Sequence, residues 1–566
     1  MRRPSLLLII LMGTLRCQAQ AYIPFPYVIE KETVADSAAV VTAHPLATRV
    51  GLEILRRGGN AVDAAVAVQF ALAVVYPQAG NIGGGGFLIY RDKAGNTAAL
   101  DYREKAPAAA SETMYQDSAG QVIPNKSRFG IFACGVPGSA DGMWEAHRKY
   151  GRLPWAQLVD PAVILAEKGY QITEREAKQL NDEKINFIRH CKIIPDFVKM
   201  QDWQAGDWLI QKNLANTLRR IAGEGRNGFY TGPIATLIVY EMTRQNGLIT
   251  LDDLRNYHSV WRTPLEFDWR GLHLISMPPP SSGGLLLQQM LGMLDESGLQ
   301  PSDSFHSAAA VHRMVETERR AYADRAVHMG DPDFWKVPVK AITHPDYLKT
   351  RMADFDPAKA TPSTGVKAGA VKESEETTHF SIVDAEGNAV AVTTTLNDSY
   401  GSRVVVTGAG FLLNNEMDDF SVKPGAPNLY GAIGGKANAI ASGKRPLSSM
   451  TPAIITRDGR LSLVVGTPGG TTIPTSVYQV ILNVYGFGRS LREAVHAKRF
   501  HHQWLPDEIQ IEEGAFSDDV VRQLEQMGYA IRSRSPIGRV EAILLEPDGK
   551  LRAVADNRGD DAAGGY

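Results

Sequence analysis

Three strand–turn–strand patterns in the second half of the chain limit most strongly what it can fold into. They are HFSIVDAEGNAVAVTTTLN, AIITRDGRLSLVVG and AILLEPDGKLRAVAD, with turn residues Gly387, Asp458-Gly459 and Asp548-Gly549. Apolar runs joined by short turns of this kind predict antiparallel hairpins. Between them, SVYQVILNVY and DDVVRQLEQMG have helical spacing. The chain is therefore expected to form an antiparallel sheet core covered by helices, an α+β or layered architecture.

The first half is predicted to be mainly helical. Residues 44–59 read as a helix with Pro45 in its first turn, ending at Gly58-Gly59. Asn60 is a suitable cap for the next helix, AVDAAVAVQFALAVVY, which is apolar on nearly every face and so should be buried between layers. GGFLIY and TAALDYRE predict a hairpin, with Arg103 leaving its second strand. Most of residues 140–350 are expected to form helices joined by Pro and Gly turns.

The N-terminus predicts an exported protein. Arg2 and Arg3 precede the apolar run LLLIILM, and Ala19 and Ala21 place small residues where a signal peptidase reads the chain. We expect residues 1–21 to be a signal peptide cleaved after Ala21, and a periplasmic or secreted mature protein. The apolar run is shorter than the roughly 20 residues that span a bilayer, so no transmembrane anchor is expected.

Charge and cysteine content exclude several classes of protein. Removing residues 1–21 takes away three arginines and no acidic residue, so the formal charge changes from -2 to -5. Nucleic-acid binding requires a concentrated basic surface, and this mild acidity argues against it. The mature chain retains only Cys134 and Cys191. They can pair in an oxidising compartment or remain as two buried thiols, and the sequence leaves both possibilities open.

An acidic, polar segment stops abruptly at a threonine pair. Residues 355–376 lack apolar periodicity and should be exposed and mobile, whereas Thr377-Thr378 begin a strand. A linker between domains is one interpretation. The alternative is that the chain is cut before Thr377. The new terminal amine, with an ordinary pKa of about 7.7 to 8, would then be a general base next to the hydroxyl of the same residue.

Several longer motifs resemble the gamma-glutamyltransferase family. In the second half they are TTHFSIVDAEGNAVAVTTTLN, GFLLNNEMDDFS, GKRPLSSMTP, GTPGGTTI, RFHHQWLPDE and DNRGDDAAGGY. In the first half they are GGNAVDAAVA, GNIGGGGFLIY, LDYREKAP and PPPSSGG. They occur in the family's order and extend over essentially the whole mature chain, so the resemblance is specific.

The resemblance implies an N-terminal nucleophile hydrolase fold, a four-layer αββα sandwich in which two stacked antiparallel sheets lie between helical layers. It also implies autocatalytic cleavage into a large subunit, residues 22–376, and a small subunit, residues 377–566. The two subunits would form one intertwined structural unit. No cofactor and no metal are implied.

The family's site residues map onto this sequence position by position. Thr377 matches the nucleophile, and Thr395 matches the threonine that contacts it. Arg103, Ser448 and Ser449 match residues that bind the substrate α-carboxylate, for which a guanidinium fork is well suited. Asn397, Glu416 and Asp419 match residues that receive the α-ammonium group. Tyr430 lies in the segment that forms a lid in bacterial relatives. Without the resemblance, Thr395 would read as an ordinary strand threonine and Arg103 as a surface arginine.

The run LSLVVGTPGGTTIPTSVYQV also has a physical interpretation of its own. A strand ends in a glycine loop that opens a helix at Pro474, which leaves unpaired N–H groups near Gly469 and Gly470. Such donors can stabilise a tetrahedral oxyanion, or the glycines can simply permit a tight turn. The resemblance assigns the pair to the oxyanion hole.

Two other patterns carry no chemistry. His496, His501 and His502 lie close together, but their spacing fits no zinc motif. The run GNIGGGG lacks the Lys-Ser or Lys-Thr of a phosphate loop and precedes a strand.

The expected function is a gamma-glutamyltransferase and glutathione hydrolase acting through a gamma-glutamyl-enzyme ester. Its partners would be small gamma-glutamyl donors such as glutathione, and amino acid or peptide acceptors, with no nucleic acid. Alternatives are a related cephalosporin (glutaryl) acylase or polyglutamate hydrolase, and, outside enzymes, a secreted solute-binding protein. Asp419 favours the first, because a glutaryl group has no amino group for that carboxylate to bind.

Overall fold

The computed structural model describes residues 28–299, 303–366, 377–423 and 435–566. The predicted signal peptide, residues 367–376 of the predicted linker, and Tyr430 lie outside the described residues.

Two antiparallel seven-stranded sheets form the centre of the molecule. Sheet A has the order β1 (Glu32–Ala35), β18 (Leu551–Ala555), β17 (Glu541–Leu545), β13 (Arg460–Gly466), β12 (Ala453–Arg457), β9 (Leu272–Ser276) and β8 (Leu265–Trp269). Sheet B has the order β19 (Ala562–Gly565), β2 (Ala39–Thr42), β10 (Thr377–Val383), β11 (Ala389–Thr395), β3 (Gly85–Arg91), β4 (Thr97–Asp101) and β7 (Val260–Arg262).

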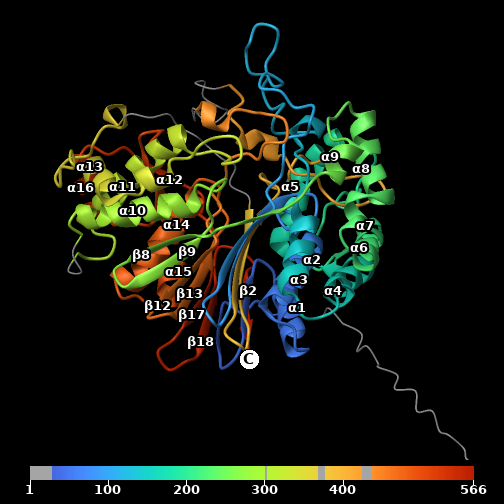
Figure 1. Ribbon diagram of the computed structural model, residues 1–566, viewed down its shortest axis with the longest axis horizontal. Coiled ribbons are helices and arrows are strands. Elements are labelled where there is room, and N and C mark those ends of the chain that lie inside the picture. The colour runs from blue at the N-terminus through green and yellow to red at the C-terminus, as the bar shows by residue number, and fades with distance from the viewer. Residues whose placement is uncertain (1–27, 300–302, 367–376, 424–434) are drawn as a thin grey trace, which may run out of the picture.

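Helices cover the outer face of each sheet (Figure 1). The helices beside sheet B are α1 (Pro45–Arg56), α2 (Ala61–Val75), α3 (Ser139–Tyr150), α4 (Trp155–Lys168), α5 (Glu174–His190), α6 (Lys212–Glu224), α7 (Asn227–Tyr230), α8 (Gly232–Arg244) and α9 (Leu251–Arg255). Those beside sheet A are α10 (Gly283–Glu296), α11 (Ala308–His328), α12 (Val339–Ile342), α13 (Pro345–Arg351), α14 (Thr472–Ile481), α15 (Leu491–His496) and α16 (Asp518–Gln526). The predicted four-layer αββα sandwich is confirmed.

Smaller elements lie outside the two main sheets. They are the strand pair β5 (Tyr170–Gln171) and β6 (Trp208–Leu209), and the sheet of β14 (Phe500–His501), β15 (Ile509–Glu512) and β16 (Ile531–Arg534). Short 3₁₀ turns span Ile131–Ala133, Ser363–Gly365, Glu416–Asp419 and Lys436–Asn438, and a π-helical turn, Leu482–Gly486, follows α14.

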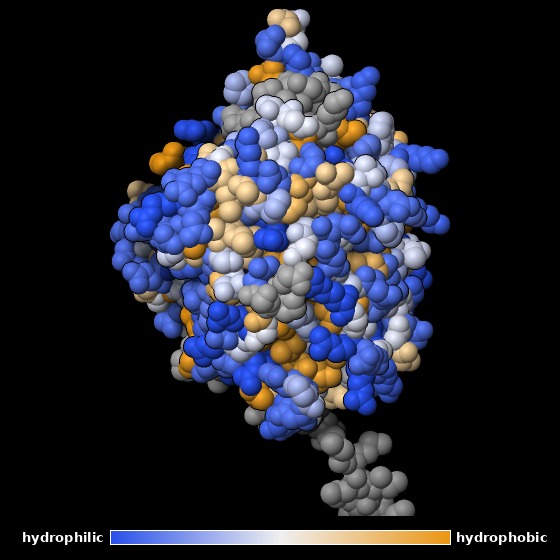
Figure 2. Space-filling view, turned by 90° about the vertical axis from the view of Figure 1, so that its left-hand side faces the viewer, coloured by the Kyte–Doolittle hydropathy of each residue, from blue (hydrophilic) through white to orange (hydrophobic). Residues whose placement is uncertain are grey.

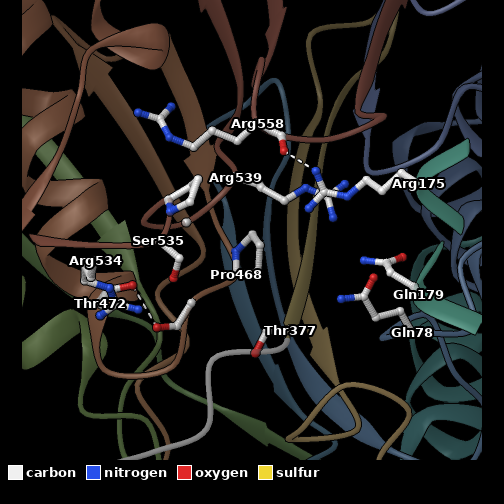
Figure 3. A pocket seen from close by; sticks show the side chains of 13 residues that line it. Gln78, Arg175, Gln179, Thr377, Pro468, Thr472, Arg534, Ser535, Arg539 and Arg558 are labelled. Atoms are coloured by element: carbon white, nitrogen blue, oxygen red, sulfur yellow. Dashed lines mark hydrogen bonds between the residues drawn. The ribbon is translucent and has the colours of Figure 1, made fainter. Parts of the chain in front are cut away.

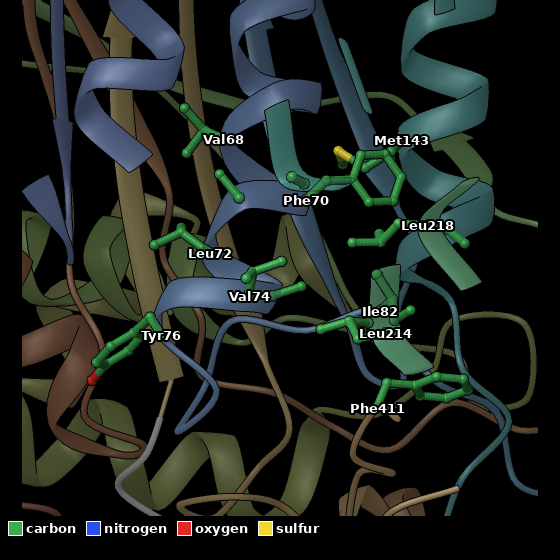
Figure 4. Close-up of a cluster of buried hydrophobic side chains, with 14 of the residues drawn as sticks. Val68, Phe70, Leu72, Val74, Tyr76, Ile82, Met143, Leu214, Leu218 and Phe411 are labelled. Carbon is green, nitrogen blue, oxygen red and sulfur yellow. The ribbon is translucent and has the colours of Figure 1, made fainter. Parts of the chain in front are cut away.

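The α2 helix is the centre of one hydrophobic core, as its composition predicts. The Asn60 side chain accepts a hydrogen bond from the Asp63 N–H, and the Asp63 carboxylate accepts one from the Asn60 N–H, which forms a capping box. All residues of α2 are buried. Phe70 and Val74 point among side chains of α3 and α6, including Leu218 (Figure 4). This packing fixes the helical layer against sheet B.

At one contact between the two sheets, a glycine stands where a side chain would collide with the opposite sheet. A Cβ atom on Gly466, the last residue of β13, would lie 2.2 Å from the ring of His379 on β10. The core between the sheets is otherwise built from small and branched side chains such as Ala391, Val464 and Ile543. Because β10 starts two residues before His379 and a loop follows Gly466, the contact brings the first residue of β10 near that loop.

One part of the helical region was predicted incompletely. Within residues 140–350 the structure contains β7 and the hairpin of β8 and β9, which pair from Leu265 to Ser276. Arg270 and Gly271 make the turn with positive φ of 48° and 77°. This hairpin completes one edge of sheet A.

Hydrophilic residues dominate the face shown in Figure 2, and hydrophobic residues are scattered among them. Among the described residues, every helix is either too short or too polar to cross a membrane.

Candidate active site

Thr377 occupies the first position of the central strand β10. It pairs across the sheet with Thr395, the last residue of β11, and the two hydroxyl oxygens are 3.4 Å apart. Only 5% of the Thr377 surface is exposed. The Asn397 N–H donates a hydrogen bond of 2.7 Å to the Thr395 hydroxyl. Asn397 adopts a φ of 77°, which turns the chain sharply behind the threonine pair.

The glycine loop after β13 lies beside Thr377. Thr377, Pro468 and Gly469 line the same cavity (Figure 3). Gly469 and Gly470 have φ of 135° and 55°, and the Gly469 carbonyl accepts hydrogen bonds from the N–H and hydroxyl of Thr472. Within the described part of the chain, neither the Gly469 nor the Gly470 N–H donates a hydrogen bond. The helix opens at Thr472, two residues before the predicted Pro474.

Arg103 reaches the same end of sheet B from the side of β3 and β4. Thr395 pairs with Gly85, and Phe87 pairs with Asp101, so the strand ends carrying Thr377, Thr395 and Arg103 are adjacent. At a spacing of about 4.8 Å per strand, the Arg103 backbone is about 14 Å from that of Thr377. Arg103 is 1% exposed, so the surface-arginine alternative is wrong.

The Arg103 guanidinium is held by acidic side chains. It forms ion pairs with the carboxylates of Glu416 and Asp419, and it donates hydrogen bonds to the carbonyls of Pro446 and Leu447, each at 3.3 Å. The predicted carboxylate-binding arginine and two of the predicted ammonium-binding residues are therefore in direct contact.

A third carboxyl group, that of Glu104, lies 3.7 Å from the same guanidinium. Burial raises the pKa of Glu104 to about 7, although the neighbouring Arg103 charge acts in the opposite direction. Burial also raises the pKa of Glu416 well above its usual range. Three carboxyl groups therefore share one guanidinium, and burial favours the protonated form of two of them.

Backbone and side-chain hydrogen bonds position Ser448 and Ser449. The Ser448 N–H donates to the Pro280 carbonyl at 2.9 Å, and the Ser448 carbonyl accepts from the Ser282 N–H and hydroxyl at 2.7 and 2.8 Å. The Ser449 hydroxyl accepts a hydrogen bond of 3.1 Å from Arg325 on α11, which is itself 1% exposed. Since that hydroxyl oxygen accepts from an arginine, its hydrogen is directed toward another partner.

The cavity beside Thr377 has a volume of about 370 Å³. Its lining includes four arginines, two glutamines and Gly469 of the glycine loop, and Figure 3 shows Gln78, Gln179 and Arg175 together on one side of it. Arg103, Ser448 and Ser449 do not line it. The site thus has two parts, with Thr377 lining the cavity and the Arg103 cluster lying on the β3 and β4 side.

The cysteines and histidines noted in the sequence lie apart from this arrangement. Cys134 and Cys191 are free thiols, and burial raises the pKa of Cys134 to about 12. His501 contacts Thr475 and Gln503, whereas His502 contacts Asp507. The histidine ring nitrogens therefore serve separate hydrogen bonds.

Two residues near Arg103 were not predicted as site residues, although both stand in motifs that were noticed in the sequence. Glu104 directly follows Arg103 in LDYREKAP, and it could have been identified as a charge beside a predicted binding arginine. Ser282, in PPPSSGG, links the loop before α10 to Ser448. Arg325 carried no signal, since it looks like any other charge on a long helix.

Known proteins resemble this chain over nearly its whole length. The Gamma-glutamyltranspeptidase family matches residues 47–566. The chain is 48% identical to a glutathione hydrolase proenzyme of Pseudomonas aeruginosa over 530 residues, covering 93% of this chain and 94% of that protein. It is 45% identical to the glutathione hydrolase proenzyme of Escherichia coli over 553 residues, covering 96% and 95%.

Among solved structures, a cephalosporin acylase from Bacillus halodurans superposes with a TM-score of 0.81 over 96% of this chain and 98% of that one. Its sequence identity of 24% supports the fold alone. The family match and the relatives at 48% and 45% identity agree, and the chain belongs to the gamma-glutamyltranspeptidase family.

Proposed function

We propose that this protein is a gamma-glutamyltransferase and glutathione hydrolase whose nucleophile is Thr377, exposed by cleavage of the bond between Glu376 and Thr377. The observation that carries the proposal is the position of Thr377. It is the first residue of a central strand, its hydroxyl faces Thr395, and it shares a cavity with a glycine loop whose N–H groups are available as donors.

The reaction begins when the Thr377 hydroxyl oxygen attacks the γ-carbonyl carbon. The hydroxyl proton passes to the residue's own α-amine, which acts as general base. The N–H groups of Gly469 and Gly470 stabilise the tetrahedral oxyanion. The protonated amine then gives its proton to the leaving nitrogen, and a gamma-glutamyl ester remains on Thr377. Water, or the amine of an amino acid or peptide, releases the glutamyl group by the reverse sequence of proton transfers.

The Arg103 cluster supports recognition of a gamma-glutamyl group. An α-carbon that carries both a carboxylate and an ammonium group would replace the direct contacts between Arg103 and its acidic partners. The α-carboxylate would bind the guanidinium of Arg103 and accept hydrogen bonds from Ser448 and Ser449. The α-ammonium would bind the carboxylates of Glu416 and Asp419, which now pair with Arg103, and would also contact the Asn397 side chain. The carboxylate of a glutaryl group would also bind Arg103 in place of Glu416 and Asp419, but a glutaryl group has no ammonium to pair with them. The two buried carboxylates would then lack a positively charged partner, which is unfavourable.

The relatives named proenzymes support processing of one precursor into two chains, here residues 22–376 and 377–566. The basic and apolar sequence of residues 1–21 supports export to the periplasm or beyond.

Two measurements test the proposal. The wild-type protein is expected to hydrolyse a gamma-glutamyl anilide much faster than a glutaryl anilide, and equal rates would favour the acylase alternative. The variant Thr377→Ala, which lacks the hydroxyl but keeps the strand, is expected to stay as one uncut, inactive chain on a denaturing gel. Normal cleavage in that variant would remove Thr377 from the nucleophile role.

A further inference from the structure

The cavity beside Thr377 lies on the opposite side of the nucleophile from the Arg103 cluster. In sheet B, β11 separates β10 from β3 and β4, whereas β2 and β19 follow on the other side. The cavity-lining Arg539 belongs to this second side, because it donates a hydrogen bond to the carbonyl of Ala43, just after β2. A substrate bonded at Thr377 with its acyl group toward Arg103 would therefore direct its amine half into the cavity.

Two of the four arginines that line the cavity are neutralised by carboxylates of the protein. Arg539 forms a two-pronged contact with Asp561, with distances of 3.0 and 2.8 Å. Arg558 pairs with Glu512 and Asp556. The guanidinium groups of Arg539 and Arg558 are therefore bonded within the protein and are less available to bind an incoming anion.

Arg175 differs from them. Its one described hydrogen bond goes to the backbone carbonyl of Arg558, and within the described ranges it forms no ion pair. It lies in the first turn of α5, whose N-terminus is fixed by a capping box between Thr173 and Glu176. Gln179, one turn later on the same helix, also lines the cavity (Figure 3). Arg175 is thus an exposed guanidinium with no carboxylate partner among the described residues, on a capped helix beside an amide, and such a group is a suitable receptor for a carboxylate.

We propose that Arg175, with Gln179, binds the free carboxylate of the substrate's amine half. This is the terminal carboxylate of the dipeptide that leaves glutathione, and the carboxylate of an amino acid or peptide acceptor. The assignment rests on the proposed function. The leaving amine of acylation and the entering amine of transfer occupy one place, because aminolysis of the ester is the reverse of acylation. A cavity of about 370 Å³ is within the usual range for small ligands, and an extended dipeptide reaches about 7 Å.

The experiment compares substrates that differ only in this carboxylate. The donor pair is glutathione and its C-terminal amide, and the acceptor pair is glycylglycine and glycylglycinamide with a gamma-glutamyl anilide as donor. In the wild-type enzyme the free acid is expected to have the higher kcat/KM in both pairs. In Arg175→Ala this preference should fall about tenfold, as for loss of one charge-assisted hydrogen bond, and Arg175→Lys should restore part of it.

The matched control is Lys178→Ala. Lys178 is an exposed cation on the same helix that pairs with Asp182 and does not line the cavity. It is expected to keep the wild-type preference for the free acid. If Arg175→Ala lowers the acid and the amide equally, or changes neither, in either pair, the inference is overturned. If the wild-type protein does not hydrolyse the gamma-glutamyl anilide, the proposed function itself fails, and this inference fails with it.

Discussion

At the scale of single residues, neighbours in sequence can have unrelated surroundings. Asp418 and Asp419 are adjacent in one 3₁₀ turn, yet the Asp418 carboxylate accepts a hydrogen bond from Ser127, whereas Asp419 pairs with Arg103. The sequence motif NNEMDDFS offered both, and only its register with the family pointed to Asp419. In the structure it is Asp419 that contacts the guanidinium of Arg103.

This difference gives a paired prediction. Asp419→Asn should raise the KM for gamma-glutamyl donors by about ten- to a hundredfold, because a hydrogen bond to a charged group contributes about 1.5 to 3 kcal/mol. Asp418→Asn should leave the KM close to that of the wild type. Steady-state kinetics with a gamma-glutamyl anilide measures both. An unchanged KM in Asp419→Asn would reject its role in amine binding.

Glu104 predicts a pH dependence of stability. Its pKa in the folded protein, about 7, is above the ordinary value of 4.5 because of burial. The folded state therefore binds the proton more tightly than the unfolded state. This stabilisation of the folded state is fully present at a pH below the ordinary pKa, and it is lost as the pH rises through the pKa of the folded protein.

In the variant Glu104→Gln the side chain at this position does not titrate, so this pH-dependent contribution to stability should be absent. Urea midpoints measured between about pH 5 and pH 8 should fall further in the wild type than in Glu104→Gln. Parallel pH profiles for the two proteins would show that Glu104 does not titrate in this range.

At the scale of elements, the loop between β13 and α14 shows what a short glycine motif achieves. A Cβ atom on Gly469 would lie 2.4 Å from the Thr472 hydroxyl oxygen, which itself bonds the Gly469 carbonyl. Gly459, in the turn between β12 and β13, also has positive φ, of 73°, but a Cβ there would meet nothing within 4 Å. Alanine variants at these two positions therefore differ in one respect. Both would place alanine at a positive φ, but only the variant at Gly469 would also create a close contact.

Alanine keeps the backbone N–H, but its Cβ would displace the 469–470 loop, so Gly469→Ala should lower kcat by about a hundredfold, as when one oxyanion donor is lost. Gly459→Ala should cost about 1 kcal/mol of stability, as a left-handed alanine does, with little change in kcat. Activity and urea unfolding of the two variants test this together. Equal kcat values would show that the 469–470 loop does not hold the oxyanion.

Much of the architecture could be predicted from the sequence, because its patterns are local. The Asn60 cap, the buried α2 helix and the three hairpins follow from periodicity and turn chemistry within a few residues. The β8–β9 hairpin was missed although LEFDW and LHLIS flank an Arg-Gly turn, because the surrounding helices dominated the interpretation of that region. The Arg325–Ser449 contact could not have been predicted, since it depends on how α11 packs across the sheet.

At the scale of the whole molecule, both sheets contain strands from before and after Thr377. In sheet A, β1, β9 and β8 precede it and the other four follow. In sheet B, β10 lies between β2 from the first part and β11 from the second. Cleavage before Thr377 would therefore cut the chain without dividing the fold, and the two chains could separate only if both sheets were broken.

The most direct test is intact-mass spectrometry of the purified, active protein under denaturing conditions, with native size-exclusion chromatography of the same sample. The account predicts two polypeptides, the smaller beginning at Thr377 and ending at Tyr566, which elute together in the native run. Full turnover of a gamma-glutamyl anilide by a sample whose backbone is continuous from residue 376 to 377 would contradict it.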